Sequence, residues 1–214
     1  MKKTLTLSTL ALATLALVGL SIPAFAGYGK AKDAAKHSSY EAMVGKPAPG
    51  FTLDAATGDG THSLSDFEDK IVVLHFQSCN CPWDVAYQPQ LNAIAEKFED
   101  RGVVFLGINS NKTESGDQIQ NYAPQANIPY TILKDPGNKV ADQYMAKTTP
   151  HMYVIDGEGT LRYVGGIEEV PGGMNQVSQM DTQYLEPVLT ALVNGSEPPY
   201  TVTKSKGCSI KRVN

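Results

Sequence analysis

Short apolar runs alternate with helical apolar patterns along most of this chain, and this alternation constrains its fold more than any other feature. Residues 71–76 (IVVLHF) and 103–108 (VVFLGI) are continuous apolar runs of strand length, rich in β-branched residues, as buried parallel strands are. Between them, residues 82–98 carry apolar side chains at a helical period, and Pro89 is predicted to kink this helix. The pattern predicts an α/β domain with a mixed central sheet and helices on both faces.

Turn and capping residues delimit the other elements. We predict strands at 51–53, 130–133, 152–155 and 161–164, a capped helical turn at 63–67, and helices at 116–124, 139–145 and 181–193. The turn at residues 156–159 (DGEG) is typical of an antiparallel hairpin. In sheets of this kind, ligands and chemistry lie at the carboxyl ends of the strands, where helices begin. We therefore expect the functional site at that edge.

The first 26 residues have the layout of a secretory signal peptide. Lys2 and Lys3 precede an apolar stretch at 5–20, and residues 24–26 (AFA) form a small–x–small cleavage pattern. A membrane anchor is the alternative, but the stretch is short and contains Thr and Ser. We predict cleavage after Ala26, a periplasmic or secreted location, and no stable membrane insertion afterwards.

The rest of the chain is long enough for one core. Residues 27–43 are small and polar and predict a flexible leader, residues 44–194 a folded domain, and residues 195–214 a tail that carries Cys208. The formal net charge of −4 becomes −6 once the two lysines of the signal peptide are removed. An acidic chain without a basic cluster argues against nucleic acid and anionic membranes as partners. No cofactor is expected.

Three cysteines, Cys79, Cys81 and Cys208, give the mature chain an odd number of thiols. In an exported protein, at least one of them is then free, shared between molecules, or reactive. Cys81 stands where the strand at 71–76 passes into a helix that opens with Pro82. Unpaired N–H groups and the helix dipole favour a thiolate there, so we predict Cys81 as the reactive group, on the exposed rim of the sheet. A buried structural cysteine is the alternative.

Residues 44–193 resemble the thioredoxin-like redoxins, which include the periplasmic disulfide reductases of cytochrome maturation and the alkyl hydroperoxide reductase / thiol-specific antioxidant proteins. Four residues match the spacing of the active-site segment of that superfamily: Phe76, Cys81, Pro82 and Pro89. Thr149-Pro150 resembles its cis-proline loop, which packs beside the reactive sulfur. Residues 207–211 (GCSIK) resemble the tail of a peroxiredoxin-like group in which a Cys-Pro site is paired with a late Gly-Cys-Ser-Ile. The resemblance implies a thioredoxin fold with an N-terminal β extension.

The usual second cysteine of a Cys-x-x-Cys motif is missing, because Asp84 occupies its position. Cys81 must therefore work alone or be resolved by another cysteine. Cys208 is our preferred resolving residue, since a flexible tail can fold back. Cys79 is the alternative, although so short a disulfide ring is strained and easily reduced.

The resemblance to true peroxiredoxins is incomplete. Leu74 stands where their proline is expected, and Pro150 where we align the arginine that polarises the peroxide. Ser78 could fill the hydroxyl role. Without the arginine, the developing oxyanion loses its main donor, so the resemblance implies weak peroxidase activity.

Four more residues surround the predicted site. His75 occupies the place where many relatives keep a buried acid, so it either relays a proton or is a core histidine. His151 follows Pro150 and is a candidate to tune the sulfur. Trp83 either docks partner proteins or shields the sulfur, and Asp84 either acts as a local acid/base or favours the helix start.

These residues support several functions. The leading hypothesis is thiol–disulfide exchange with protein partners or small thiols, in which Cys81 attacks a disulfide and a second cysteine resolves the mixed disulfide. The alternative is a thiol peroxidase that reduces a hydroperoxide through a sulfenic acid. A third is a soft-metal module that holds Cu(I) between Cys79 and Cys81 with His75 or His151. A scaffold without activity is the fourth.

Overall fold

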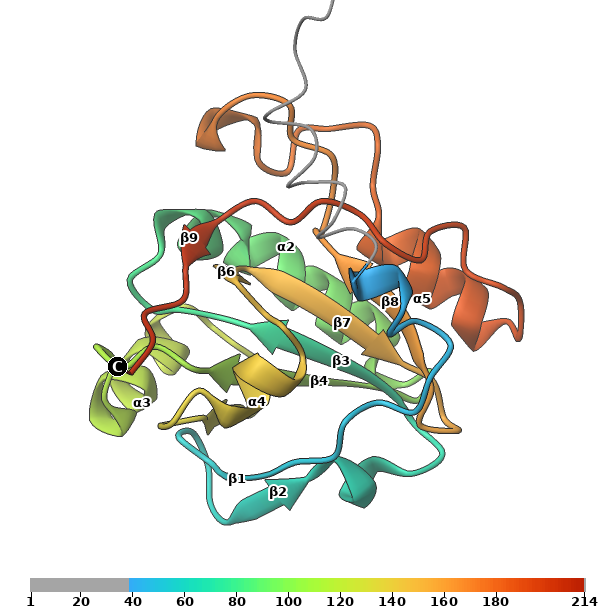
Figure 1. Ribbon diagram of the computed structural model, residues 1–214. Helices are drawn as coiled ribbons and strands as arrows, with labels where there is room; N and C mark the ends of the chain where they lie inside the picture. Colours follow the sequence, from blue (N-terminus) through green and yellow to red (C-terminus); the bar gives the residue numbers. More distant parts are fainter. Residues whose placement is uncertain (1–38, 214) are drawn as a thin grey trace, which may run out of the picture.

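The computed structural model describes residues 39–213, so the predicted signal peptide lies outside the described residues. A five-stranded mixed sheet in the order β5-β4-β3-β7-β8 forms the centre of the domain (Figure 1). Its strands are β3 (Ile71–Phe76), β4 (Val103–Asn109), β5 (Ile132–Lys134), β7 (His151–Ile155) and β8 (Leu161–Gly165). The central strand β3 pairs parallel with β4 and antiparallel with β7. The predicted mixed sheet is confirmed.

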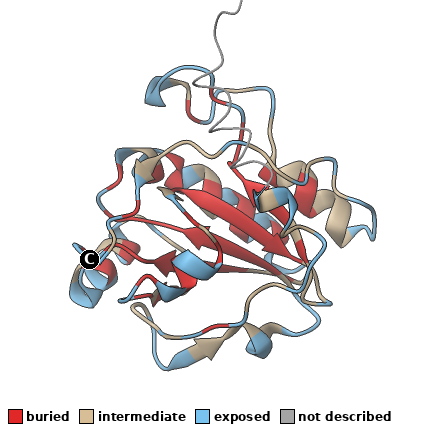
Figure 2. Ribbon diagram, viewed as in Figure 1, coloured by how far each residue is buried: buried red, intermediate tan, exposed pale blue. Residues whose placement is uncertain are grey.

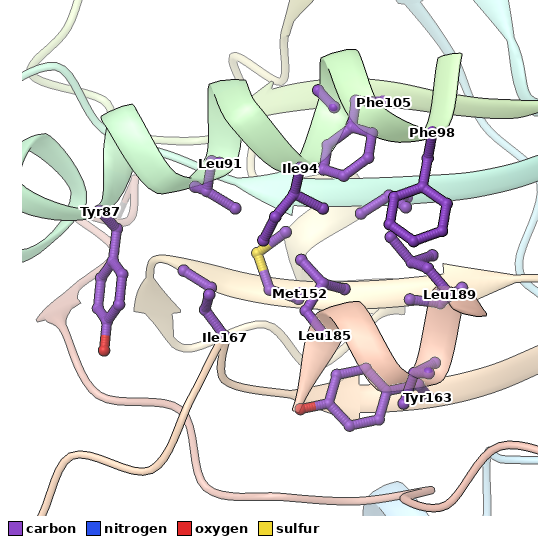
Figure 3. Close-up of a cluster of buried hydrophobic side chains, with 14 of the residues drawn as sticks. Tyr87, Leu91, Ile94, Phe98, Phe105, Met152, Tyr163, Ile167, Leu185 and Leu189 are labelled. Carbon is purple, nitrogen blue, oxygen red and sulfur yellow. The ribbon is translucent and has the colours of Figure 1, made fainter. Parts of the chain in front are cut away.

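Helices cover both faces of this sheet, as predicted. Val73 of β3 faces the long helix α2 (Pro82–Glu99) and the helix α5 (Leu185–Val193), whereas Val72 and Leu74 face the helix α4 (Lys139–Gln143). This alternation follows from the two-residue period of a strand. Figure 3 shows the core between α2, α5 and the sheet, and Figure 2 shows that the strands of this five-stranded sheet are buried almost throughout.

Smaller elements lie at the edges of the sheet. The hairpin of β1 (Thr52–Asp54) and β2 (Thr61–Ser63) forms the predicted N-terminal extension and leads into the 3-10 turn η1 (Leu64–Phe67). The helix α3 (Gly116–Gln125) packs Ile119 on Ile132 of β5. Among residues 39–213, no helix combines the length and apolar character needed to cross a bilayer.

Two predicted boundaries differ from the structure. The leader was expected to extend to residue 43, but Tyr40 lies in a helical turn and its hydroxyl donates to the Met145 carbonyl at 2.9 Å. The last helix begins at Leu185 rather than at 181. Gln183 pairs antiparallel with Glu168, and this pairing is incompatible with a helix. Residues 169–183, including η2 (Met174–Gln176), instead form an excursion that projects beyond the sheet (Figure 1).

The C-terminal tail corrects a further expectation, because it is docked along the domain rather than flexible. We name residues 200–213 the C-terminal strap. It begins parallel to β8, where the amide of Val164 donates to the Thr201 carbonyl at 2.9 Å. It continues to β9 (Cys208–Ser209), which pairs antiparallel with β6 (Thr148–Thr149) (Figure 1). The side chain of Ile210 then packs in the hydrophobic core between the sheet and α4.

Candidate active site

Cys81 is the N-cap residue of α2, at the carboxyl end of the central strand. Pro82 occupies the first helical turn, where it needs no hydrogen-bond acceptor, and the Cys81 carbonyl accepts the amide of Val85 at 3.0 Å. The helix runs 18 residues from this point. The positive end of the helix dipole lies at this N-cap, although the Cys81 side chain accepts no hydrogen bond from the helix.

The loop that precedes β7 lies directly beside the sulfur. The Thr149-Pro150 peptide bond is cis, and Cys81 Sγ donates to the Thr149 carbonyl oxygen at 2.9 Å. The structure therefore places the predicted proline loop against the predicted reactive group.

The C-terminal strap brings a second thiol to the same point. Cys208 is directly opposite Thr149 in the β6–β9 pair. Burial, a hydrogen bond to Cys81 and the charge of Cys81 raise the pKa of Cys208 to about 11, whereas the backbone N–H of Trp83 opposes this shift. Both thiols are free. Two sulfurs from distant parts of the chain thus meet at the start of α2.

The expected exposure of Cys81 is wrong. Cys81 is only 2% exposed, whereas Cys208 is partly exposed. The physical reason is the strap: sequence patterns place residue 81 on the rim of the sheet, but β9 covers that rim and pairs with β6 there. Cys81 is buried by the tail and faces the proline loop.

Gly207 allows this close approach. A Cβ atom at residue 207 would lie 2.0 Å from the Thr149 carbonyl oxygen and 2.5 Å from its carbonyl carbon. Both are backbone atoms beside the cis-proline, so they cannot move aside as a flexible side chain does. Only glycine lets residue 208 reach Cys81 along this path.

Cys79 has different surroundings. It is 9% exposed and packs with Ile119, Ala123 and Ile132 in a small hydrophobic cluster. Burial, followed by the charges of Glu114 and Asp84, raises the pKa of its thiol to about 12. Cys79 thus packs in this cluster, whereas Cys208 hydrogen-bonds with Cys81, so Cys208 remains the preferred resolving residue.

We expect Cys79→Ala to leave thiol–disulfide exchange within about twofold of the native rate while lowering the free energy of unfolding by about 1 kcal/mol, the cost of a small cavity. Insulin reduction and urea unfolding measure the two effects. Loss of exchange in a variant that keeps its fold would show that Cys79 takes part in the reaction.

A buried glutamate that the sequence analysis missed holds the active-site loop. Glu114 accepts hydrogen bonds from the Ser78 hydroxyl, from the Cys79 amide at 3.0 Å and from the Asn80 amide at 3.3 Å. Asn109, the last residue of β4, also donates to it. The available signal was positional, since Glu114 follows the strand next to β3 at the edge where the site was expected.

Replacing Glu114 by glutamine is expected to lower the free energy of unfolding by about 2 kcal/mol. The new amide N–H₂ would face groups that are themselves donors. Lys134, whose pKa burial lowers, would also lose a stabilising charge. Urea unfolding measures the loss, and Glu96→Gln on the exposed side of α2 is the control. Equal stability of the two variants would contradict this role.

His75 and Asp84 form a buried pair. His75 Nε2 lies 2.9 Å from Asp84 Oδ1, and its Nδ1 is 3.1 Å from the Tyr130 hydroxyl. The Ser78 amide donates to Asp84 Oδ2 at 2.6 Å. Burial raises the pKa of Asp84, and His75 and the Ser78 amide oppose that shift. Both side chains have partners inside the domain, so a proton relay through them stays a prediction.

The remaining predicted site residues have structural partners. His151 is buried between the rings of Tyr40 and Tyr153, and burial, aided by Lys147, lowers its pKa to about 3, so it is neutral. Trp83 is partly exposed, and the Lys206 ammonium of the strap lies 5.9 Å from its ring centre.

Peroxide and metal chemistry lack their expected groups. The three arginines of the sequence bond elsewhere: Arg101 to Asn194, Arg162 to Asp156 and Glu197, and Arg212 to Asp142. The Ser78 hydroxyl donates to Glu114. Residues 39–213 contain no group of three or more His, Cys, Asp or Glu side chains arranged to hold a metal ion. The copper alternative therefore has no donor set in this part of the chain.

A cysteine at the start of α2, a cis-proline beside it and a mixed sheet beneath it define a thioredoxin-like thiol oxidoreductase. Residues 44–164 match the AhpC/TSA family, and the chain belongs to that family.

Relatives agree with this class. A thiol-disulfide oxidoreductase ResA of Bacillus thuringiensis subsp. konkukian is 24% identical over 145 residues, which is 68% of this chain and 78% of the relative. A thiol:disulfide interchange protein DsbE of Pseudomonas fluorescens is 32% identical over 131 residues, 60% of this chain and 70% of the relative. A hypothetical protein from Sinorhizobium meliloti, known from a crystal structure, is 26% identical in sequence. Its structure superimposes on this one with a TM-score of 0.71, over 79% of this chain and 94% of that chain.

Proposed function

We propose that the protein is an exported thiol–disulfide oxidoreductase whose redox couple is Cys81 and Cys208. The observation that carries this proposal is the β6–β9 pair, which holds Cys208 opposite Thr149 while Cys81 Sγ donates to the carbonyl of the same residue. Export is inferred from the signal-peptide pattern of residues 1–26.

The reaction exchanges two electrons between this couple and a partner. With both cysteines reduced, one thiolate attacks a partner disulfide, and the other partner sulfur leaves as a thiolate. The second cysteine of the couple then attacks the mixed disulfide and releases the first partner sulfur. The protein gains a Cys81–Cys208 disulfide, the partner gains two thiols, and the protons of the couple pass to them.

The strap supplies what a Cys-x-x-Cys motif normally provides. Asp84 stands at the position of the second cysteine, but its carboxylate is engaged with His75 and the Ser78 amide. Cys208 instead approaches the helix start from the other end of the chain, where the Trp83 N–H is directed at its sulfur. The hydrogen bond between the two thiols supports a couple whose members are already adjacent in the reduced protein. Protein disulfides and small thiols are the proposed partners.

Disulfide mapping of the oxidised chain tests this function. Trypsin leaves Cys79 and Cys81 together on residues 71–97 and Cys208 on residues 207–211, so linkage is assigned in the native chain and in Cys79→Ser. We expect the two peptides to be joined in both proteins, and insulin reduction to be lost in Cys81→Ser and in Cys208→Ser. Absence of the linkage would contradict the proposal, and peroxide turnover that requires Cys81 would favour a peroxidase instead.

A further inference from the structure

We infer that exchange partners react with the protein at Cys208, so that Cys81 serves as the internal sulfur of the couple; this rests on the proposed function. The starting observation is access. Cys81 is 2% exposed, its Sγ is directed at the Thr149 carbonyl, and β9 lies over it. Cys208 is partly exposed on the covering strand.

Uncovering Cys81 would require the strap to detach. Beyond Cys208, the Ile210 amide donates to the Lys147 carbonyl at 3.0 Å, and Ile210 is buried. The Lys211 amide donates to Asn111 Oδ1 at 2.8 Å, and the Lys211 carbonyl accepts from the Lys112 amide at 2.9 Å. These contacts hold β9 in place independently of any disulfide. A partner therefore meets the strap first.

Substitution at a disulfide selects one sulfur for attack and expels the other. The incoming thiolate approaches along the S–S axis, so it needs open space beside the attacked sulfur and a stable anion on the departing one. Attack at Cys208 expels Cys81. Attack at Cys81 would expel Cys208 and would need space that β9 occupies.

The stability of the departing thiolate favours the same site of attack as the exposure of the two sulfurs does. Cys81 leaves as a thiolate at the N-cap of an 18-residue helix, where the positive end of the helix dipole favours an anion. Burial raises the pKa of Cys208, which makes it a poorer leaving group. Access and leaving-group stability both select Cys208 as the attacked sulfur.

The reaction balances in both directions. A partner thiolate forms a bond to Cys208 Sγ, the Cys81–Cys208 bond breaks, and Cys81 takes the electron pair. A second partner thiolate then attacks the partner sulfur of the mixed disulfide and releases Cys208, so the partner is oxidised and the couple is reduced. In reverse, Cys208 attacks a partner disulfide, and Cys81 attacks Cys208 Sγ to close the couple.

Glutathione identifies the attacked sulfur. The full chain with Cys79→Ser is oxidised to its Cys81–Cys208 disulfide, treated briefly with reduced glutathione, quenched with acid, and blocked with N-ethylmaleimide. Each cysteine then lies on its own tryptic peptide, residues 71–97 and 207–211. At the earliest times, we expect glutathione on Cys208 and maleimide on Cys81, with at least a tenfold excess over the reverse pattern.

The same reaction in urea is the matched control, because unfolding exposes both sulfurs and the ratio should approach one. Glutathione found mainly on Cys81, or equally on both residues in the folded chain, would overturn the inference while leaving the couple itself intact. If no Cys81–Cys208 disulfide forms before glutathione is added, the proposed function fails, and the inference fails with it.

Discussion

Replacing Gly207 by alanine is expected to lower the effective concentration of Cys208 at Cys81 by about a hundredfold, the loss typical of reacting groups displaced by an ångström. A Cβ at residue 207 would lie 2.0 Å from the Thr149 carbonyl oxygen, within a backbone segment that Pro150 holds rigid. The strap must then withdraw. The measurement is the fraction of Cys81–Cys208 disulfide in a series of glutathione redox buffers.

Gly50→Ala is the control for this variant, since nothing lies within 4 Å of a Cβ added there. A second readout separates displacement of the strap from unfolding: Cys81 should be alkylated faster by iodoacetamide in Gly207→Ala, while the far-ultraviolet circular dichroism stays native. A variant that keeps the native disulfide equilibrium would show that the strap reaches Cys81 by another path.

Replacing His151 by phenylalanine is expected to lower, by about one, the number of protons that the chain takes up when it unfolds in acid. The pKa of His151 is lowered to about 3 by burial, so the folded chain keeps it neutral, while the unfolded chain protonates it below its ordinary value of about 6.5. Native stability is therefore full above that pH. It falls by about 1.4 kcal/mol per pH unit as the pH drops from about 6 towards 3.

In His151→Phe, this contribution to the slope should vanish, because phenylalanine does not titrate. The ring still packs against Tyr40 and Tyr153. Urea unfolding at several pH values in this range measures the slope, and His62→Gln, on the partly exposed β2, is the matched histidine control. Equal slopes in the native chain and His151→Phe would mean that His151 is protonated in the folded state.

The two variants test different parts of one arrangement. Gly207 concerns the strap that supplies the second sulfur, and His151 concerns the core beneath the proline loop, where it pairs with Phe76 across β7 and β3. Loss of the redox couple with a native fold in Gly207→Ala, together with an intact redox couple and a changed acid dependence of stability in His151→Phe, would show that the strap contributes chemistry and that the residue after Pro150 is a buried neutral histidine outside the couple.

Local patterns were sufficient for the central elements. The apolar run at 71–76 and the cysteine before Pro82 predicted β3 and the start of α2, and both lie where they were expected. Such features depend on hydrophobic period and helix capping, which neighbouring residues determine. The cis-proline loop followed from the resemblance to the redoxins, and its contact with Cys81 agrees with it.

Contacts between distant segments were beyond reach of these patterns. Glu114 carries no local motif, and its role follows only from the hydrogen bonds it accepts from the Cys79 and Asn80 amides and the Ser78 hydroxyl. The helix α5 begins later than predicted because Gln183 pairs with Glu168. A pairing between two residues across a loop leaves no helical or strand period in the sequence.

By itself, the sequence determined the sheet, the helix start and the identity of Cys81 as the candidate reactive group, because hydrophobic burial and capping act over a few neighbouring residues. Only the tertiary structure decided that the tail docks, that Gly207 passes against Thr149, and that Cys208 covers Cys81. The physical reason is that a strand of two residues is too short to show a period. Its position depends on steric fit to a backbone assembled from the rest of the chain.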